Sequence, residues 1–341
     1  MTCRMEKIEP QVMPAPPNTI ASLRAGFDVV ANHIAVISIP IALDLVLWLG
    51  PHLQLKTLIT RLFNVLASAN SSQTLQPTDI VSSSLAAIQS FFAQFNLFSL
   101  LRTIPVGIPS LMAFKLPVTI PSGQLKLIDI TNPFAVLIII AGILFVGLGA
   151  GTFFYTLITQ ISLSGQLDLR GAARSWVRSS VQVLSLAIAL LILYIVVSVP
   201  SSCAIYAIGL LGLPLGQFSF FLYFGVLIWL AFPLIFSAHG IFVNKNNALI
   251  SVQRSMVLTR LTLPSTGLFL LFVFAISEGL DILWRVPPDN SWLTLIGVGG
   301  HAFVASALLA ASIIYYRDAD TWTQETLRMA KAAKDLPLQG S

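Results

Sequence analysis

Six apolar stretches, each about as long as a membrane-crossing helix, constrain this chain more than any other feature. A helix of roughly twenty apolar residues crosses a bilayer and satisfies its own backbone hydrogen bonds. We predict spans at Val29–Leu49, Pro133–Leu157, Val181–Val199, Phe218–Ala238, Leu263–Leu283 and Trp292–Tyr315. Only 10% of the residues are charged, against about 25% in soluble domains. So few charges cannot cover a soluble protein of this size.

The expected fold class is all-α: a polytopic transmembrane helical bundle of six spans, with interfacial elbow helices and an outer amphipathic helical insert. The lipid bilayer is the expected partner, together with another membrane protein if the role is accessory. A net charge of +5 would suggest nucleic acid on a soluble protein. Here the basic residues are spread over short loops, which is typical of topology signals, and we expect no nucleic acid.

The distribution of basic residues predicts the orientation. With the N-terminus inside, the inner segments hold 13 Lys and Arg residues and the outer segments hold six. Positive charge favours the cytoplasmic side, so we expect a cell-membrane protein with both termini in the cytoplasm. The predicted parts are a tail and elbow (1–28), the first span (29–49), an extracytoplasmic insert (50–132), a five-span bundle (133–316) and a cytoplasmic tail (317–341).

The insert, residues 50–132, has a helical and an irregular part. Leu53–Ser68 and Asp79–Leu101 show apolar residues at helical spacing, with Thr78 as a cap for the second helix. Proline and glycine then recur over residues 105–123, which argues against regular helix. We interpret the insert as a helical cap on the outer membrane face. A lid over a lipid-accessible cavity and a water-soluble binding domain are the alternatives.

Prolines and glycines mark special points of the predicted bundle. Pro40 and Pro233 are expected to kink the first and fourth spans. The apolar stretch Cys203–Leu213 is too short to span, so we interpret it as a re-entrant or interfacial helix. Gly147 and Gly151 form a small-residue pattern that allows close helix packing.

Two loops on the predicted inner side share the pattern Leu, four residues, Arg, Ser, a large apolar residue, Val. The loops lie 80 residues apart, and their shared cores are Arg174, Ser175 and Trp176 and Arg254, Ser255 and Met256. We interpret each as an elbow, a short amphipathic helix in the membrane interface whose arginine faces the headgroups. Chance similarity between two basic loops is the alternative.

These elbows resemble the Ala-Leu-x-Arg-Ser-Trp elbows of a broad bacterial group. That group comprises the polytopic membrane domain sometimes fused to glycerophosphodiester phosphodiesterases and its stand-alone relatives of unknown function. The resemblance covers roughly Leu163 to Trp322. Members often end their last span with Tyr-Tyr-Asp, whereas residues 315–318 read Tyr-Tyr-Arg-Asp here. The resemblance implies a membrane domain built of elbows and spans, without catalytic activity.

Charged and histidine side chains at membrane depth are the candidate polar site, because burying them there is costly. The candidates are Asp44, Glu278, Asp281, Arg285, His33, His239 and His301. Helical spacing places Glu278, Asp281 and Arg285 on one face, and we interpret them as an ion cluster that ties the fifth span to the insert. A proton or cation relay that includes Asp44 is the alternative.

The histidines are expected to be hydrogen-bonded inside the bundle and not to bind a metal. A zinc site needs three or four ligands around one point, but His33 and His239 belong to the inner third of the bundle and His301 to its middle. We predict no metal site, cofactor or catalytic residue, because the chain carries none of the membrane-enzyme motifs we sought, such as His-Glu-x-x-His or Gly-x-Ser-x-Gly.

The sequence therefore favours a non-enzymatic membrane protein with an accessory or scaffold role in the cell envelope. The alternative is a transporter or lipid-handling protein with the insert as a lid. That alternative requires a cavity between the first, second and fifth spans, near Asp44 and Glu278. A membrane enzyme is the least supported class.

Overall fold

The computed structural model describes residues 16–70, 79–113, 119–210 and 216–335. Its α-helices are α1 (Thr19–Asn32), α2 (Ser38–Leu49), α3 (Lys56–Asn70), α4 (Asp79–Gln94), α5 (Pro133–Ser164), α6 (Leu169–Leu210), α7 (Gly216–Ala231), α8 (Ser237–Val243), α9 (Ala248–Leu261), α10 (Leu263–Trp284) and α11 (Thr294–Asp335). The described residues also form the short 3-10 helices η1 (Ile34–Ile37), η2 (Leu97–Leu101) and η3 (Phe232–Leu234). The strands β1 (His52–Gln54) and β2 (Leu127–Asp129) pair in parallel.

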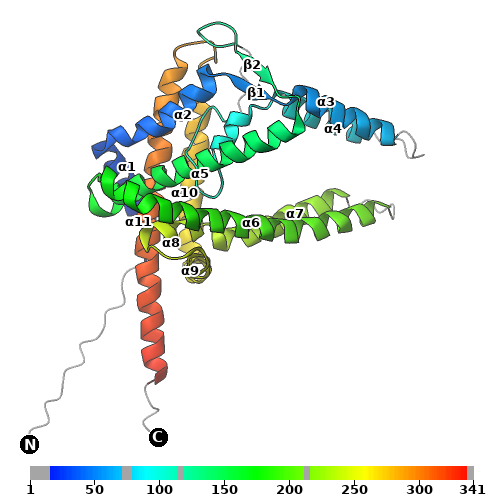
Figure 1. The fold of residues 1–341 in the computed structure, drawn as a ribbon. Helices are drawn as coiled ribbons and strands as arrows, with labels where there is room; N and C mark the ends of the chain where they lie inside the picture. The colour runs from blue at the N-terminus through cyan, green and yellow to red at the C-terminus, as the bar shows by residue number, and fades with distance from the viewer. Residues whose placement is uncertain (1–15, 71–78, 114–118, 211–215, 336–341) are drawn as a thin grey trace, which may run out of the picture.

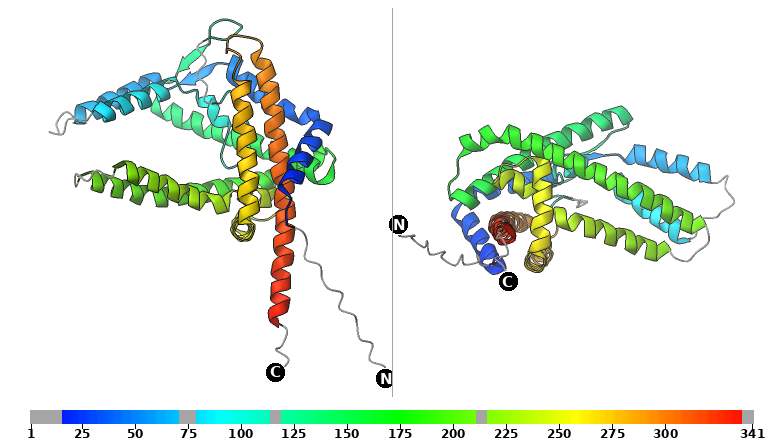
Figure 2. Two further views of the ribbon diagram at one scale, coloured as in Figure 1. Left: turned by 180° about the vertical axis from the view of Figure 1, so that it is seen from behind. Right: turned by 90° about the horizontal axis from the view of Figure 1, so that it is seen from below.

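The predicted all-α membrane fold is confirmed. Among the described residues, five helical segments are long and apolar enough to cross a membrane, or six if the bent pair α1–α2 counts as one. The helices form two sets: α10 and α11 run side by side, while α5, α6 and α7 lie across them (Figures 1 and 2). Hydropathy predicts which helices prefer an apolar environment, but neighbouring helices set their tilt.

The first predicted span is not one straight helix. The chain bends by 89° between α1 and the segment that ends at Leu49. His33 ends α1, η1 follows, and α2 starts two residues before Pro40. Proline lacks a backbone N–H and is tolerated in the first turn of a helix. The break therefore precedes Pro40, and this proline does not kink a continuous span.

Two further prolines affect their helices differently: α6 continues through Pro200, whereas the helix around Pro233 is interrupted. The predicted separate helix at Cys203–Leu213 is wrong for the described residues, because α6 continues through Pro200 to Leu210; residues 211–213 lie outside the described part. At Pro233 the short helix η3 separates α7 from α8, but residues 221–243 still form one candidate span, so the predicted kink stays a prediction.

The two elbows also differ. Leu169 begins α6, which runs without a break into the predicted third span, so a separate first elbow helix is wrong. The second elbow is a helix of its own, α9, which ends before Thr262, and α10 follows. The C-terminal tail expected from residue 317 continues α11 as helix to Asp335.

The insert contains the predicted helices with altered ends. The helix predicted from Leu53 begins at Lys56, because His52–Gln54 forms β1. The second helix starts at Asp79 as predicted but ends at Gln94, and η2 follows it; its proposed cap, Thr78, lies outside the described residues. Figure 1 shows α3 and α4 as a pair that projects from the rest, on the same side as α6 and α7.

The main core lies where α1, α2, α5 and α11 meet, and part of the insert belongs to it. Large buried side chains from α2 and α5, such as Trp48, Phe154 and Ile158, pack in this cluster. The Pro/Gly-rich segment of the insert contributes Leu111 and Met112 to the same cluster. The insert is therefore more than a surface cap, because its irregular segment fills the interior.

Candidate functional site

Asp44 on α2 is the most deeply buried charged side chain of the predicted site, with no exposed surface. Its Oδ1 accepts hydrogen bonds from the Ser110 hydroxyl at 2.5 Å and the Met112 amide at 3.0 Å. Its Oδ2 accepts one from the Leu111 amide at 3.1 Å. All three donors come from the insert, so this carboxylate joins the insert to the first predicted span.

The donors belong to what we call the buried loop, residues 106–113. A loop in an apolar interior must have its backbone N–H groups paired. Asp44 pairs two of them, and the Ser110 hydroxyl accepts a third hydrogen bond from the Ala113 amide at 2.9 Å. The Asp44 carboxylate thus accepts hydrogen bonds from backbone N–H groups of an irregular segment. In a spanning helix, intrahelical hydrogen bonds pair these groups.

Two glycines of α5 make room for this segment. A Cβ on Gly147 would lie 2.6 Å from the Leu101 carbonyl oxygen, and one on Gly151 would lie 2.9 Å from the Gly107 Cα. The sequence predicted that this pair serves helix–helix packing. In the structure the two glycines lie against the insert and not against another helix. Their nearest neighbours are Leu101 for Gly147 and Gly107 for Gly151.

The other predicted carboxylates lie on α10. Asp281 is 2.7 Å from Nδ1 of His301 on α11 and 3.7 Å from the Arg285 guanidinium. Glu278 is exposed and has no partner among the described residues. The predicted cluster therefore ties α10 to α11 instead of to the insert, and the structure brings His301 into it.

The other two histidines have separate partners. The Nδ1 of His33 donates to the Val29 carbonyl at 3.1 Å, and Nε2 of His239 lies 2.8 Å from the Ser312 hydroxyl. No group of three or more His, Cys, Asp or Glu side chains in the described parts of the chain could hold a metal ion.

The second elbow, on α9, is fastened to its surroundings. The Ser255 hydroxyl donates to the Pro233 carbonyl at 2.7 Å, which the break in the fourth span leaves available. Arg254 lies 3.6 Å from Asp320 on α11, and Asp320 also accepts a hydrogen bond from the Asn244 side chain at 2.9 Å. Met256 is half-buried. The elbow arginine thus pairs with a carboxylate of the protein.

The first elbow makes different contacts. Ser175 donates only within its own helix, to the Gly171 and Ala172 carbonyls, each at 3.1 Å. The Trp176 indole donates to the Gly149 carbonyl on α5 at 2.7 Å. Arg174 is exposed and has no ion-pair partner in the described part of the chain. The two elbows are therefore similar in sequence but not in contacts.

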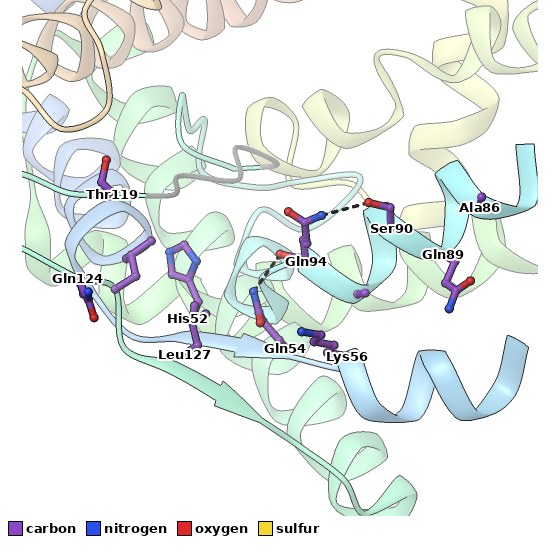
Figure 3. A pocket seen from close by; sticks show the side chains of 12 residues that line it. His52, Gln54, Lys56, Ala86, Gln89, Ser90, Gln94, Thr119, Gln124 and Leu127 are labelled. Carbon is purple, nitrogen blue, oxygen red and sulfur yellow. Dashed lines mark hydrogen bonds between the residues drawn. The ribbon is translucent and has the colours of Figure 1, made fainter. Parts of the chain in front are cut away.

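A pocket of about 750 Å³ lies within the insert, between β1, α4 and the chain before β2 (Figure 3). Its polar lining is mostly neutral: Gln54 donates to the Gln94 carbonyl at 3.4 Å, and the Gln94 amide donates to Ser90 at 3.1 Å. His52 contributes its ring, and burial lowers the pKa of this histidine, while its bond to the Leu47 carbonyl acts in the opposite direction. Among the described residues that line the pocket, the titratable side chains are His52 and Lys56.

The sequence analysis did not identify the hydrogen-bond partner of Asp44 or the residues that surround the second elbow. Ser110, Asn244 and Asp320 are unremarkable in the sequence, because their partners lie 66 to 76 residues away. One signal was present: residues 106–114 read Val-Gly-Ile-Pro-Ser-Leu-Met-Ala-Phe, which is too apolar for a solvated loop.

Comparison with known proteins gives no relative for this chain. No family model, no curated protein and no solved structure matches it.

Proposed function

We propose that this chain is a non-catalytic, multi-pass membrane protein with an accessory or scaffold role in the cell envelope. The observation that carries the proposal is the environment of Asp44. An intramembrane carboxylate is by default a functional candidate, but here Ser110, Leu111 and Met112 use it to hold the buried loop in place. The deepest charge among the candidates therefore has a structural role.

The transporter alternative receives less support from the same region. It requires a cavity near Asp44 and Glu278 with the insert as a movable lid. Asp44 is fully buried, and Leu111 and Met112 pack beside it in the core. Glu278 is exposed. The insert thus resembles a built-in part of the core more than a lid.

The orientation and the kinship also belong to this proposal. An arrangement with both termini in the cytoplasm is supported by the excess of Lys and Arg in the inner segments, with the insert on the opposite side of the cell membrane. Kinship with the membrane domain found beside glycerophosphodiester phosphodiesterases is supported by the paired elbows that contain Arg174 and Arg254.

The experiment is affinity purification of the full-length tagged chain in mild detergent from its own host, with mass spectrometry of the co-purifying proteins. We expect one polypeptide at a fixed stoichiometry. The control is an unrelated multi-pass protein with the same tag. Repeated recovery of the chain alone, together with solute uptake into proteoliposomes that contain only this chain, would replace the accessory role by transport.

A further inference from the structure

A second pocket, of about 290 Å³, lies between the N-terminal part of α6 and the connection from α8 to α9. Three basic side chains line it: Arg174 and Arg178 from α6, and Lys245 from the connection. All three are exposed, and none has an ion-pair partner in the described part of the chain. The pocket contains no carboxylate among its lining residues, so its charge is strongly positive.

Local geometry holds these cations together. The Arg178 guanidinium donates to the Lys245 carbonyl at 3.1 Å, which links α6 to the connection. Lys245 has a φ of 53°, a left-handed conformation that is uncommon for residues other than glycine. The nearby Asp168 accepts a hydrogen bond from the Arg170 amide at 3.0 Å through its Oδ1, and its Oδ2 lies beside Gly171 at the edge of the pocket, so the three basic side chains outnumber one adjacent carboxylate.

The pocket also offers neutral hydrogen-bond donors. The Nδ2 of Asn246 is buried and has no hydrogen-bond partner within the described residues. Gln182 uses its Oε1 to accept from the Ala248 amide at 3.0 Å, so its amide N–H groups stay available. Guanidinium, ammonium and amide donors, with no carboxylate among the lining residues, match the oxygen atoms of a phosphate group.

The surface beside the pocket points to the source of that phosphate. Arg174, Arg178 and Val181 follow each other at helical spacing on one face of α6. Beyond the small Ser185, the same face continues toward the C-terminus with four exposed apolar residues: Ile188, Ile192, Val196 and Val199. An exposed apolar face that leads away from a basic pocket suits acyl chains, which a free phosphate ion would not need.

We propose that this pocket binds the headgroup of an anionic phospholipid, whose acyl chains lie along the apolar face of α6. Basic pockets between membrane helices are a known means of binding such headgroups. The phosphate contacts Arg174, Arg178 and Lys245, and the amides of Gln182 and Asn246 complete the set of donors. The site shares no residue with the Asp44 contacts and does not depend on the accessory role.

The test is native mass spectrometry of the delipidated full-length protein with phosphatidylglycerol or phosphatidylcholine of identical acyl chains. Wild type is expected to retain one phosphatidylglycerol in clear preference to phosphatidylcholine. Replacing Arg174 by Gln should weaken phosphatidylglycerol binding about fivefold, since a basic residue near an anionic lipid contributes roughly that factor. The matched control is Arg260→Gln, because Arg260 is exposed on α9 and lies outside the pocket.

The outcomes separate three explanations. A loss confined to Arg174→Gln, with an unchanged thermal unfolding temperature, supports the site. Equal losses in both variants would reduce the effect to general surface charge and overturn the proposal. Displacement of the lipid by a tenfold excess of inorganic phosphate would also overturn it, because the pocket would then bind a free anion.

Discussion

The helices α6 and α11 are both 42 residues long and both contain a strongly apolar stretch, but they have different surroundings. Of the most apolar stretch of α11, 61% of the residues are buried inside the protein, against 11% for α6. Figure 2 shows α11 beside α1 and α10, while α6 extends outward with α7. One helix is the centre of the molecule, and the other presents its side chains outward.

Small residues on α11 contribute to this difference. The buried face of α11 carries small residues, among them Ala302, Ala307 and Ala311, and Gly26 of α1 packs against the last two. Small residues allow close backbone approach, which drives helix association in membranes. The exposed face of α6 carries larger residues such as Ile188 and Ile192, which suit contact with lipid chains.

The largest expected effect concerns the carboxylate that holds the insert in the central region. Replacing Asp44 by Ala leaves the Ser110 hydroxyl and the Leu111 and Met112 amides without their acceptor. We expect a loss of about 4 kcal/mol in the free energy of unfolding, since hydrogen bonds to charged groups are individually strong. Denaturant titration in detergent micelles measures it.

The control for this variant is Glu278→Ala, because Glu278 is exposed and unpaired among the described residues. It should change stability by less than about 0.5 kcal/mol. If the two variants have equal stability but Asp44→Ala alone abolishes solute uptake, the carboxylate is functional and the proposed structural role is wrong.

A smaller effect is expected from enlarging a glycine in each region. A Cβ on Gly26 would lie 2.5 Å from the Ala307 carbonyl oxygen and 2.6 Å from the Ala311 Cβ, so Gly26→Leu must separate α1 from α11. Gly225 of α7 has open space around it. We expect Gly26→Leu to cost about 2 kcal/mol by overpacking, and Gly225→Leu to cost little. If Gly26→Leu and Gly225→Leu lower the thermal unfolding temperature equally, α1 is packed no more tightly against α11 than α7 is against its neighbours, and the comparison of the two regions is wrong.

The smallest effect concerns the two elbows. Ser255→Ala removes a hydrogen bond between elements and leaves the Pro233 carbonyl without that donor, which should cost about 1 kcal/mol. Ser175→Ala removes hydrogen bonds within one helix turn and should cost about 0.3 kcal/mol. Hydrogen exchange at α9 should rise only in the first variant. Comparable exchange in both would mean that the elbows have the same role.

Much of the architecture could be predicted from residues close together in the chain. The helices α5 and α10 follow from unbroken apolar stretches, because a helix pairs its own backbone groups wherever lipid or protein surrounds it. The amphipathic spacing of α3 and the irregularity at Pro233 are local properties in the same sense. The candidate site was predicted in part: Asp281 and Arg285 do interact, as their spacing indicated.

The partners of those residues could not be predicted. Asp44 meets Ser110 across 66 residues, and Asp320 meets Asn244 across 76. In the sequence, only its apolar residues distinguish the buried loop from a surface loop. No neighbouring residue in the sequence indicates that Asp281 pairs with His301 and not with a residue of the insert.

Hydropathy reports the free energy of leaving water, which is similar for lipid and for a protein interior. The sequence by itself therefore predicted an all-α chain with six spans, and the described residues form five helical segments, or six with the bent pair, that are apolar enough to cross a membrane. Only the tertiary structure decided that α11 is central and α6 peripheral, that the first span bends by 89°, and that a carboxylate secures a loop in the core. These outcomes depend on which side chains fit together in space.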